Sequence, residues 1–323
     1  MSWQQKIRGF WSQSKWLNKA LLPLSLLYYL GHLINYHLLS SPKAVKPFVI
    51  CVGNIVIGGA GKTLFAIELA RKLIALGYKV AFVSRGYGAS IKHTKTPIQV
   101  DLARHNASQV GDEPLLLAAI APTFVCVNRF KAALMANVNQ PDIIIMDDGL
   151  QNNQLVQDYR FLITDADYAF GNKYILPAGP LREPFNRALK DKVDCTVLIL
   201  NSKNSAQPKG LNCDLEANIV LKNKPDDTQK YYAFCSLANP QKFYRSLIIQ
   251  GFCLSMTKDF KDHHLYSPKE LNVLSNLASQ YRLITTEKDI VKIPHDMRKS
   301  IESFKIGLEF DIPQGLLAKL SSR

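Results

Sequence analysis

The sequence is short of acidic residues, and its first part has none. No Asp or Glu precedes Glu68, although several lysines and arginines do, and the 323-residue chain has a formal net charge of +14. Such a charge favours an anionic partner, usually nucleic acid or anionic lipid. Because no nucleic-acid recognition module is evident, we expect no nucleic-acid partner and favour anionic lipid.

Paired cysteines are also missing. No Cys-x-x-Cys motif occurs, which argues against a zinc site or a disulfide framework and suits reduced thiols in a cytosolic protein. Internal repeats and low-complexity tracts are absent as well. With 47% hydrophobic and 20% charged residues, the chain has the composition of a folded protein that is long enough for two α/β domains.

A long uninterrupted apolar run is the third absence. The most apolar stretch, residues 21–39, contains Pro23, Gly31, His32 and Asn35. It therefore falls short of the ~20 consecutive apolar residues that a transmembrane helix needs. A signal peptide also fits poorly, because the basic segment before the stretch is long and a glycine-rich loop follows soon after it.

The N-terminal segment instead has tryptophan and a helical pattern. All three tryptophans lie in the first 16 residues, among lysines and arginines. Apolar residues recur there at helical spacing, at Trp3, Ile7, Phe10, Leu17 and Leu21. A basic, tryptophan-bearing amphipathic helix is typical of segments that lie among lipid headgroups. We expect residues 1–40 to associate with a membrane surface; a helix that packs on its own domain is the alternative.

The most informative motif is Gly53-Asn-Ile-Val-Ile-Gly-Gly-Ala-Gly-Lys-Thr63, between a strand-like run and a helix-like run. Loop N–H groups and a helix N-terminus attract phosphates, a lysine reaches the outer phosphates, and a following hydroxyl ligates Mg²⁺. Val56 takes the place of the first glycine of the strict pattern. We predict nucleotide binding by the loop residues Gly58, Gly59, Ala60, Gly61, Lys62 and Thr63.

Beyond residue 40, strand-like and helix-like runs alternate, as in α/β folds. We predict a P-loop NTPase-type domain with a parallel sheet over residues 41–208, a polar linker at 201–210, and a smaller α/β domain over 209–323 that contributes to the site. The expected strands are 48–52, 80–84, 124–127, 143–146, 161–164, 196–200, 231–235 and 282–285. The expected helices are 62–76, 113–121, 129–137, 240–250 and 268–281.

Two carboxylates, Asp147 and Asp148, follow the strand-like run 143–146. Asp-Asp-Gly after a strand is often only a turn. Beside a phosphate loop, however, a carboxylate at a strand end holds or orients Mg²⁺. Mg²⁺ needs few protein ligands when phosphate oxygens complete its shell, so Thr63 with one or two of these carboxylates would suffice.

Three further motifs are open to two interpretations. Ser84-Arg-Gly-Tyr-Gly88 is either a loop that a ligand approaches closely or a structural turn. Asp112 opens a helix, where it could be a catalytic carboxylate or an N-cap. His263 could be a catalytic residue or a structural histidine.

In their order along the chain, these motifs resemble those of the tetraacyldisaccharide 4'-kinases, the lipid A 4'-kinases of Gram-negative bacteria. The resemblance covers nearly the whole chain, and the valine at 56 belongs to the family's form of the loop. The matching motifs are 52–54, 58–63, 84–88, 111–114, 147–151, Leu176-Pro-Ala-Gly-Pro-Leu-Arg-Glu183, Asp262-His263 and Thr286-Glu-Lys-Asp289.

The resemblance implies transfer of the ATP γ-phosphoryl group to the 4'-hydroxyl of an acylated glucosamine disaccharide 1-phosphate, giving lipid IVA. It also implies a peripheral protein on the cytoplasmic face of the bacterial inner membrane, and leaves the oligomeric state undefined. Asp112 would accept the hydroxyl proton and His263 would pair with it. The other implied roles are phosphate contacts from Lys62, Arg129 and Arg182, and Mg²⁺ contacts from Thr63, Asp147, Asp148 and Glu183.

One residue departs from the family pattern. Members usually have histidine after the Asp-Asp-Gly-x-Gln run, whereas this chain has Asn152. An asparagine forms hydrogen bonds but carries no charge and transfers no proton. We therefore expect a positioning role at this position.

The main alternative is a membrane-associated partition-type ATPase, which shares Gly-Gly-x-Gly-Lys-Thr. Such proteins normally carry a lysine immediately before the first glycine, whereas this chain has Ile57. A nucleotide-regulated binding module without turnover is the third hypothesis, and it would make Asp112 and His263 dispensable.

Overall fold

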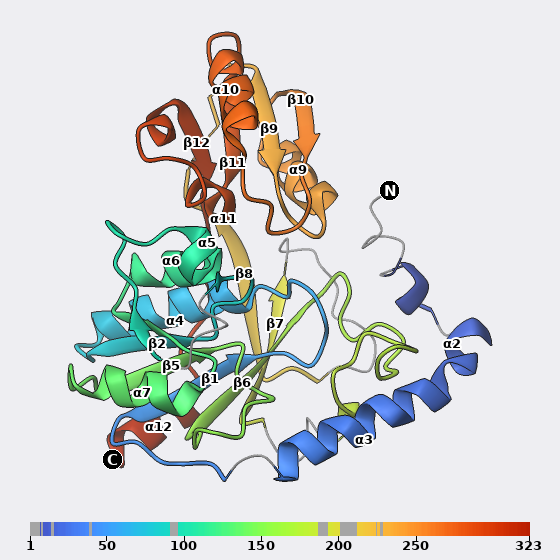
Figure 1. Ribbon diagram of the computed structural model, residues 1–323, viewed down its shortest axis with the longest axis vertical. Helices are drawn as coiled ribbons and strands as arrows, with labels where there is room; N and C mark the ends of the chain where they lie inside the picture. Colours follow the sequence, from blue (N-terminus) through green and yellow to red (C-terminus); the bar gives the residue numbers. More distant parts are fainter. Residues whose placement is uncertain are drawn as a thin grey trace.

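Two β-sheets with flanking helices make up the protein (Figure 1). The computed structural model describes residues 7, 9–13, 16–38, 41–90, 96–186, 193–200, 212–223, 225–226 and 229–323. The linker expected at 201–210 lies outside these residues. The α/β class with a large, mostly parallel sheet is confirmed.

The larger sheet has the strand order β13-β8-β7-β6-β1-β5-β2-β4-β3 among the described residues. Only β3 and β13 run antiparallel to their neighbours. The central strands are almost wholly apolar because helices cover both faces of the sheet. The strands are β1 (Phe48–Gly53), β2 (Val80–Ser84), β3 (Ile98–Gln99), β4 (Thr123–Val125), β5 (Ile143–Asp147), β6 (Tyr159–Asp165), β7 (Cys195–Leu200), β8 (Leu215–Leu221) and β13 (Ile306–Glu309).

Helix α4 follows the phosphate loop and packs on one face of this sheet. Phe65, Leu69 and Leu73 recur at helical spacing and are fully buried. The Phe65 ring lies 5.1 Å from that of Phe161 and 4.6 Å from that of Phe310. The helices around the larger sheet are α4 (Lys62–Ala75), α5 (Ala107–Val110), α6 (Asp112–Ala118), α7 (Arg129–Asn137) and α12 (Gln314–Ser321).

The smaller sheet is parallel throughout, in the order β10-β9-β11-β12, and extends from one end of the larger sheet (Figure 1). Ser267 and Glu270 form a capping box that starts α10. The elements are β9 (Tyr231–Cys235), α9 (Pro240–Ile249), β10 (Leu254–Asp259), α10 (Pro268–Leu277), β11 (Arg282–Thr286), α11 (Glu287–Ile290), the 3₁₀ helix η2 (Met297–Ser300) and β12 (Ile301–Phe304).

The boundary between the two sheets differs from the one expected at residue 209. Strands β8 and β13 pair with each other in the larger sheet, and Leu316 of α12 lies in that sheet's core. Only Lys305 separates β12 from β13, and Lys222 N donates to its carbonyl at 2.9 Å. The chain therefore leaves the larger sheet near residue 222 and re-enters it at Ile306.

Two N-terminal helices, α2 (Trp16–Ala20) and α3 (Leu22–Leu38), lie along the outside of the larger sheet's domain (Figure 1). They are held by polar contacts: Asn18 Nδ2 donates to Ala178 O at 2.9 Å, and Ser25 Oγ donates to Ile175 O at 2.8 Å. Trp3 and parts of the segment before residue 16 lie outside the described residues. Within the described ranges, no helix is long and apolar enough to cross a bilayer.

Candidate active site

The phosphate loop connects β1 to α4, and its last glycine adopts a backbone conformation that favours glycine. Gly61 has φ +80°, and a Cβ atom there would lie 2.5 Å from Ile199 Cδ1. Lys62 begins α4, and its Nζ lies 3.2 Å from Asn54 Oδ1 and 3.5 Å from Asp148 Oδ1. The loop therefore wraps closely over the end of the sheet and directs its lysine toward the carboxylates.

A side chain at position 61 should destabilise the protein. Gly61→Ala adds a Cβ that contacts Ile199, so we expect a loss of roughly 1–3 kcal/mol beyond that of a matched control. The control is Gly77→Ala, since Gly77 also has a positive φ (+93°) but open space around it. Urea unfolding of both variants measures the difference, and equal losses would show that the Ile199 contact has no energetic effect.

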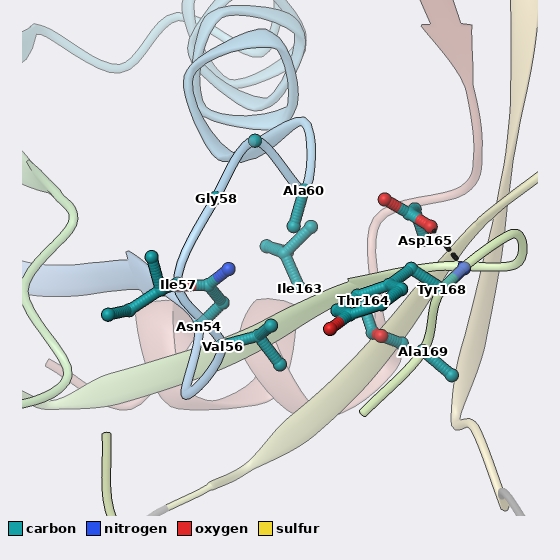
Figure 2. Close-up of a pocket in the computed structure, with 11 residues that line it drawn as sticks. Asn54, Val56, Ile57, Gly58, Ala60, Ile163, Thr164, Asp165, Tyr168 and Ala169 are labelled. Carbon is teal, nitrogen blue, oxygen red and sulfur yellow. Dashed lines mark hydrogen bonds between the residues drawn. The ribbon is translucent and has the colours of Figure 1, made fainter. Parts of the chain in front are cut away.

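Asn54 lies beneath this loop (Figure 2), beside a small cavity of about 10 Å³ that the loop shares with Thr164 and Asp165 at the end of β6. Its side chain is fully buried, and its Nδ2 has no hydrogen-bond partner among the described residues. A buried donor without a partner is costly, so this group fits a position that a ligand oxygen or a water satisfies.

Thr63 and Asp147 make a pair that fits Mg²⁺. Thr63 Oγ1 donates to Asp147 Oδ2 at 3.0 Å, while the buried Asp147 Oδ1 has no hydrogen-bond partner in the part of the chain that the structure describes. Burial raises the pKa of Asp147 to about 7, and the charges of Glu113 and Asp148 add to this effect. Among the described residues, no three His, Cys, Asp or Glu side chains form a metal cage. The pair still fits Mg²⁺, because phosphate oxygens and water fill most of that ion's shell.

Asp148 faces cations. Its φ is +52°, and its carboxylate accepts from Arg182 at 3.1 Å besides lying near Lys62. Burial would raise the pKa of Asp148, but these two cations lower it to about 2. Glu183, also expected near the metal, accepts from Gln151 Nε2 at 2.9 Å. The structure thus gives the three expected metal carboxylates different partners.

The motif at residues 176–183 pairs with the start of the phosphate loop. Arg182 N donates to Ile55 O at 2.7 Å, and Ile57 N donates to Pro180 O at 3.0 Å. Arg182 Nη1 also donates to Gln151 Oε1 at 3.1 Å. Through these contacts the non-regular backbone of the motif holds the phosphate loop and places the Arg182 guanidinium beside Asp148.

Arg129 starts α7 and is buried. Its Nη1 reaches the carbonyls of Cys126 and Val127 at 3.4 and 3.5 Å, and its Nε has no partner within the described ranges. Burial and the charge of Arg85 together lower the pKa of Arg129 to about 10. A buried guanidinium with a free donor suits an anion.

Asp112 and His263 lie close together although Asp112 belongs to the domain of the larger sheet and His263 to that of the smaller sheet. Asp112 begins α6 and is buried, and His263 follows β10 with φ +56°. His263 Nδ1 lies 3.0 Å from Asp112 Oδ2, and the Tyr87 ring lies 5.4 Å from the imidazole. Burial would raise the pKa of Asp112, but the His263 hydrogen bond and two lysines hold it below its ordinary value.

The sequence predicted no function for those two lysines, Lys288 and Lys292, or for Glu113. Lys288 Nζ lies 3.0 Å from Glu113 Oε1. The signal in the sequence was the motif Thr286-Glu-Lys-Asp289, which matched the family but carried no chemistry by itself. Asn152 takes part in a local turn, where its Oδ1 accepts from Gln154 N at 3.1 Å.

Comparison with known proteins gives one consistent family. The sequence model described as "Tetraacyldisaccharide-1-P 4'-kinase" matches residues 17–323. The tetraacyldisaccharide 4'-kinase of Paramagnetospirillum magneticum is 38% identical over 97% of this chain and 97% of its own length. That of Parvibaculum lavamentivorans is 41% identical over 86% of this chain and 82% of its own length.

The fold agrees with one solved structure in particular. This is the crystal structure of the "apo" form of LpxK from Aquifex aeolicus in complex with ATP, which superposes with a TM-score of 0.71 at 24% identity. The similarity covers 95% of this chain and 99% of that chain. It shows that the two-sheet arrangement is shared.

Proposed function

The chain belongs to the tetraacyldisaccharide-1-P 4'-kinase family, and we propose that it uses ATP to phosphorylate the 4'-hydroxyl of an acylated glucosamine disaccharide 1-phosphate. It is a kinase, and the reaction gives lipid IVA in lipid A biosynthesis. One observation carries the assignment of the site: His263 of the smaller domain lies 3.0 Å from Asp112. The next residue, Glu113, acts electrostatically on Asp147 beside the phosphate loop.

ATP binds at the phosphate loop in this proposal, and the Aquifex aeolicus protein of the same fold was solved in complex with ATP. The loop N–H groups and the start of α4 receive the phosphates, and Lys62 turns from Asn54 and Asp148 to the outer phosphates. Thr63 and Asp147 hold Mg²⁺, with Asp148 and Glu183 nearby. The ion, when bound, neutralises charge on the phosphate oxygens.

In the transfer step, the 4'-oxygen forms a bond to the γ-phosphorus as the bond to the β,γ-bridging oxygen breaks, and ADP leaves. Asp112 accepts the hydroxyl proton, and His263 keeps the carboxylate oriented by donating from Nδ1. The lowered pKa of Asp112 makes it a weak base. That is sufficient because a loose phosphoryl-transfer transition state demands mainly positioning and charge neutralisation. Arg182 and Arg129 supply further positive charge.

The partition-type ATPase is not favoured. The family match spans nearly the whole chain, and Ile57 stands where such an ATPase carries its lysine. Moreover, an ATPase that uses only water as acceptor has no need of the contact between Asp112 and His263 across the two sheets.

Radiolabel transfer tests the proposed function. The full chain, given ATP labelled at the γ-position and a purified acylated disaccharide 1-phosphate, should label the lipid with Mg²⁺ present. Chelation of the metal should stop the transfer. Label found only in inorganic phosphate would instead support an ATPase.

We further propose that α2 and α3 bind the cytoplasmic surface of the bacterial inner membrane, where the acyl chains of the acceptor remain. Leu26 and Leu27 of α3 are 59% and 65% exposed. Ser25 of the same helix donates to Ile175 O at 2.8 Å, directly before the motif that carries Arg182 and Glu183. A lipid held along α3 would therefore lie near the site.

Removing this apolar surface should weaken membrane binding. The double variant Leu26→Asp and Leu27→Asp is expected to lower vesicle affinity at least about tenfold, because each buried leucine contributes about 1.5–3 kcal/mol. Sedimentation with vesicles that contain anionic lipid measures it. Val138→Asp, at an exposed valine of the larger sheet's domain, is the control. Equal binding by the two variants would contradict the proposed membrane contact.

A further inference from the structure

The motif Thr286-Glu-Lys-Asp289 lies at the junction between the two sheets. Strand β11 ends at Thr286, whose Oγ1 accepts from Asp289 N at 3.0 Å and so caps α11. Figure 1 shows α11 at the lower end of the smaller sheet, next to α5 and α6 of the larger unit. Residues on α11 can therefore contact the helix that starts with Asp112.

Asp289 fixes α11 in place. Its carboxylate is fully buried and accepts from Ser236 N at 2.9 Å and from Tyr266 Oη at 3.0 Å. Lys292 Nζ lies 2.8 Å from it and supplies the countercharge. A buried carboxylate with this many donors holds its helix in one position. The backbone from which the side chain of Lys288 extends is held in place as a result.

Lys288 reaches across to the larger sheet's domain. Its Nζ lies 3.0 Å from Glu113 Oε1 and 3.7 Å from Asp112 Oδ2. The same atom lies 3.5 Å from His263 Nε2. Lys288 thus contacts both members of the Asp112–His263 pair, and its partners come from both sheets.

The position of Lys288 also determines the hydrogen-bonding role of the imidazole. An ammonium group only donates, so the ring nitrogen that faces it, Nε2, must accept. The proton of a neutral ring then resides on Nδ1, which donates to Asp112. This tautomer leaves the carboxylate ionised and oriented.

We propose that Lys288 is a positioning residue for phosphoryl transfer. Its ammonium group joins the two domains through Glu113 and Asp112, and it holds His263 in the tautomer that donates to Asp112. This inference rests on the proposed kinase reaction.

Removing the ammonium should slow the chemical step and change its pH dependence. We expect Lys288→Met to lower kcat roughly 10- to 100-fold, the range for misplaced catalytic groups, with little change in KM for ATP. The groups that face Asp112 are His263, Lys288, Lys292 and Glu113. With one cation lost, the pKa of Asp112 rises, so the acidic limb of the kcat–pH profile should move to higher pH.

The comparison uses full-length protein and label transfer to the acylated disaccharide 1-phosphate. Lys269→Met, at an exposed lysine of the same domain, is the matched control, and Lys288→Arg should recover most of the lost rate. Thermal unfolding of each variant shows whether it folds, and Lys288→Gln replaces the methionine variant if that variant does not.

A Lys288→Met enzyme with kcat within twofold of Lys269→Met and an unmoved acidic limb would overturn the inference. Absence of transfer by the unaltered chain would instead overturn the proposed function, so the two failures are distinguishable.

Discussion

Lys62→Ala should lose phosphoryl transfer almost completely. We expect kcat for lipid labelling to fall by roughly 10³-fold or more, since preorganised positive charge at the transferring group is among the largest contributions to such catalysis. The geometry supports this expectation, because Lys62 begins α4 directly after the phosphate loop and its Nζ faces the carboxylate end of β5. A steady-state label-transfer assay at saturating ATP measures the loss.

The matched control for this change is Lys131→Ala, at an exposed lysine on α7. It removes an equal charge and should leave the rate unchanged. Normal lipid labelling by Lys62→Ala would contradict the assignment of the phosphate loop as the ATP site.

Asp112→Asn should also stop transfer while ATP still binds. A lost general base costs about 10² to 10⁴ in rate, and the amide cannot take the hydroxyl proton. His263 and the two lysines would then face a neutral group, which removes the electrostatic reason for their approach. Label transfer gives the rate, and fluorescence titration with a nucleotide analogue gives the affinity.

Asp311→Asn, at an exposed carboxylate before α12, serves as the control and should behave as the unaltered chain. If Asp112→Asn instead left ATP consumption and lipid phosphorylation intact, the protein would be better described as a nucleotide-regulated binding module. His263→Ala should give a smaller loss than Asp112→Asn, because it removes the orienting donor and leaves the base.

Much of the fold could be predicted because local pattern and tertiary burial agree. The apolar run at 48–52 is the central strand β1, and helix α4 starts at Lys62 as its spacing indicated. Strands β8, β12 and β13 were among those that escaped prediction. Strands β12 and β13 have only four residues each, and β8 pairs with β13, which lies far from it in the chain. The polar stretch at 201–210 therefore predicted a domain boundary there, whereas strands β8 and β13, which follow it in the chain, pair within the larger sheet.

The candidate site likewise contains residues that the sequence identifies and residues that only the structure brings together. Phosphate-loop residues are contiguous, so a motif identifies them. The contact between Asp112 and His263 spans 151 positions, and only the family resemblance connected the two before the structure did. Lys288 lies in a motif that matches the family, but the motif indicated no chemistry, and a lysine next to a helix cap looks like any surface lysine until its contacts with Glu113 and Asp112 are seen.

The position of the new phosphate tests the central claim most directly. The full chain is incubated with ATP, Mg²⁺ and the acylated disaccharide 1-phosphate, and the product is examined by two-dimensional phosphorus–proton correlation. We predict a second phosphorus resonance coupled to the proton at carbon 4' of the distal sugar, with ADP formed in equal amount. ATP consumption without a new lipid phosphorus, or a phosphorus coupled to another sugar proton, would contradict the account.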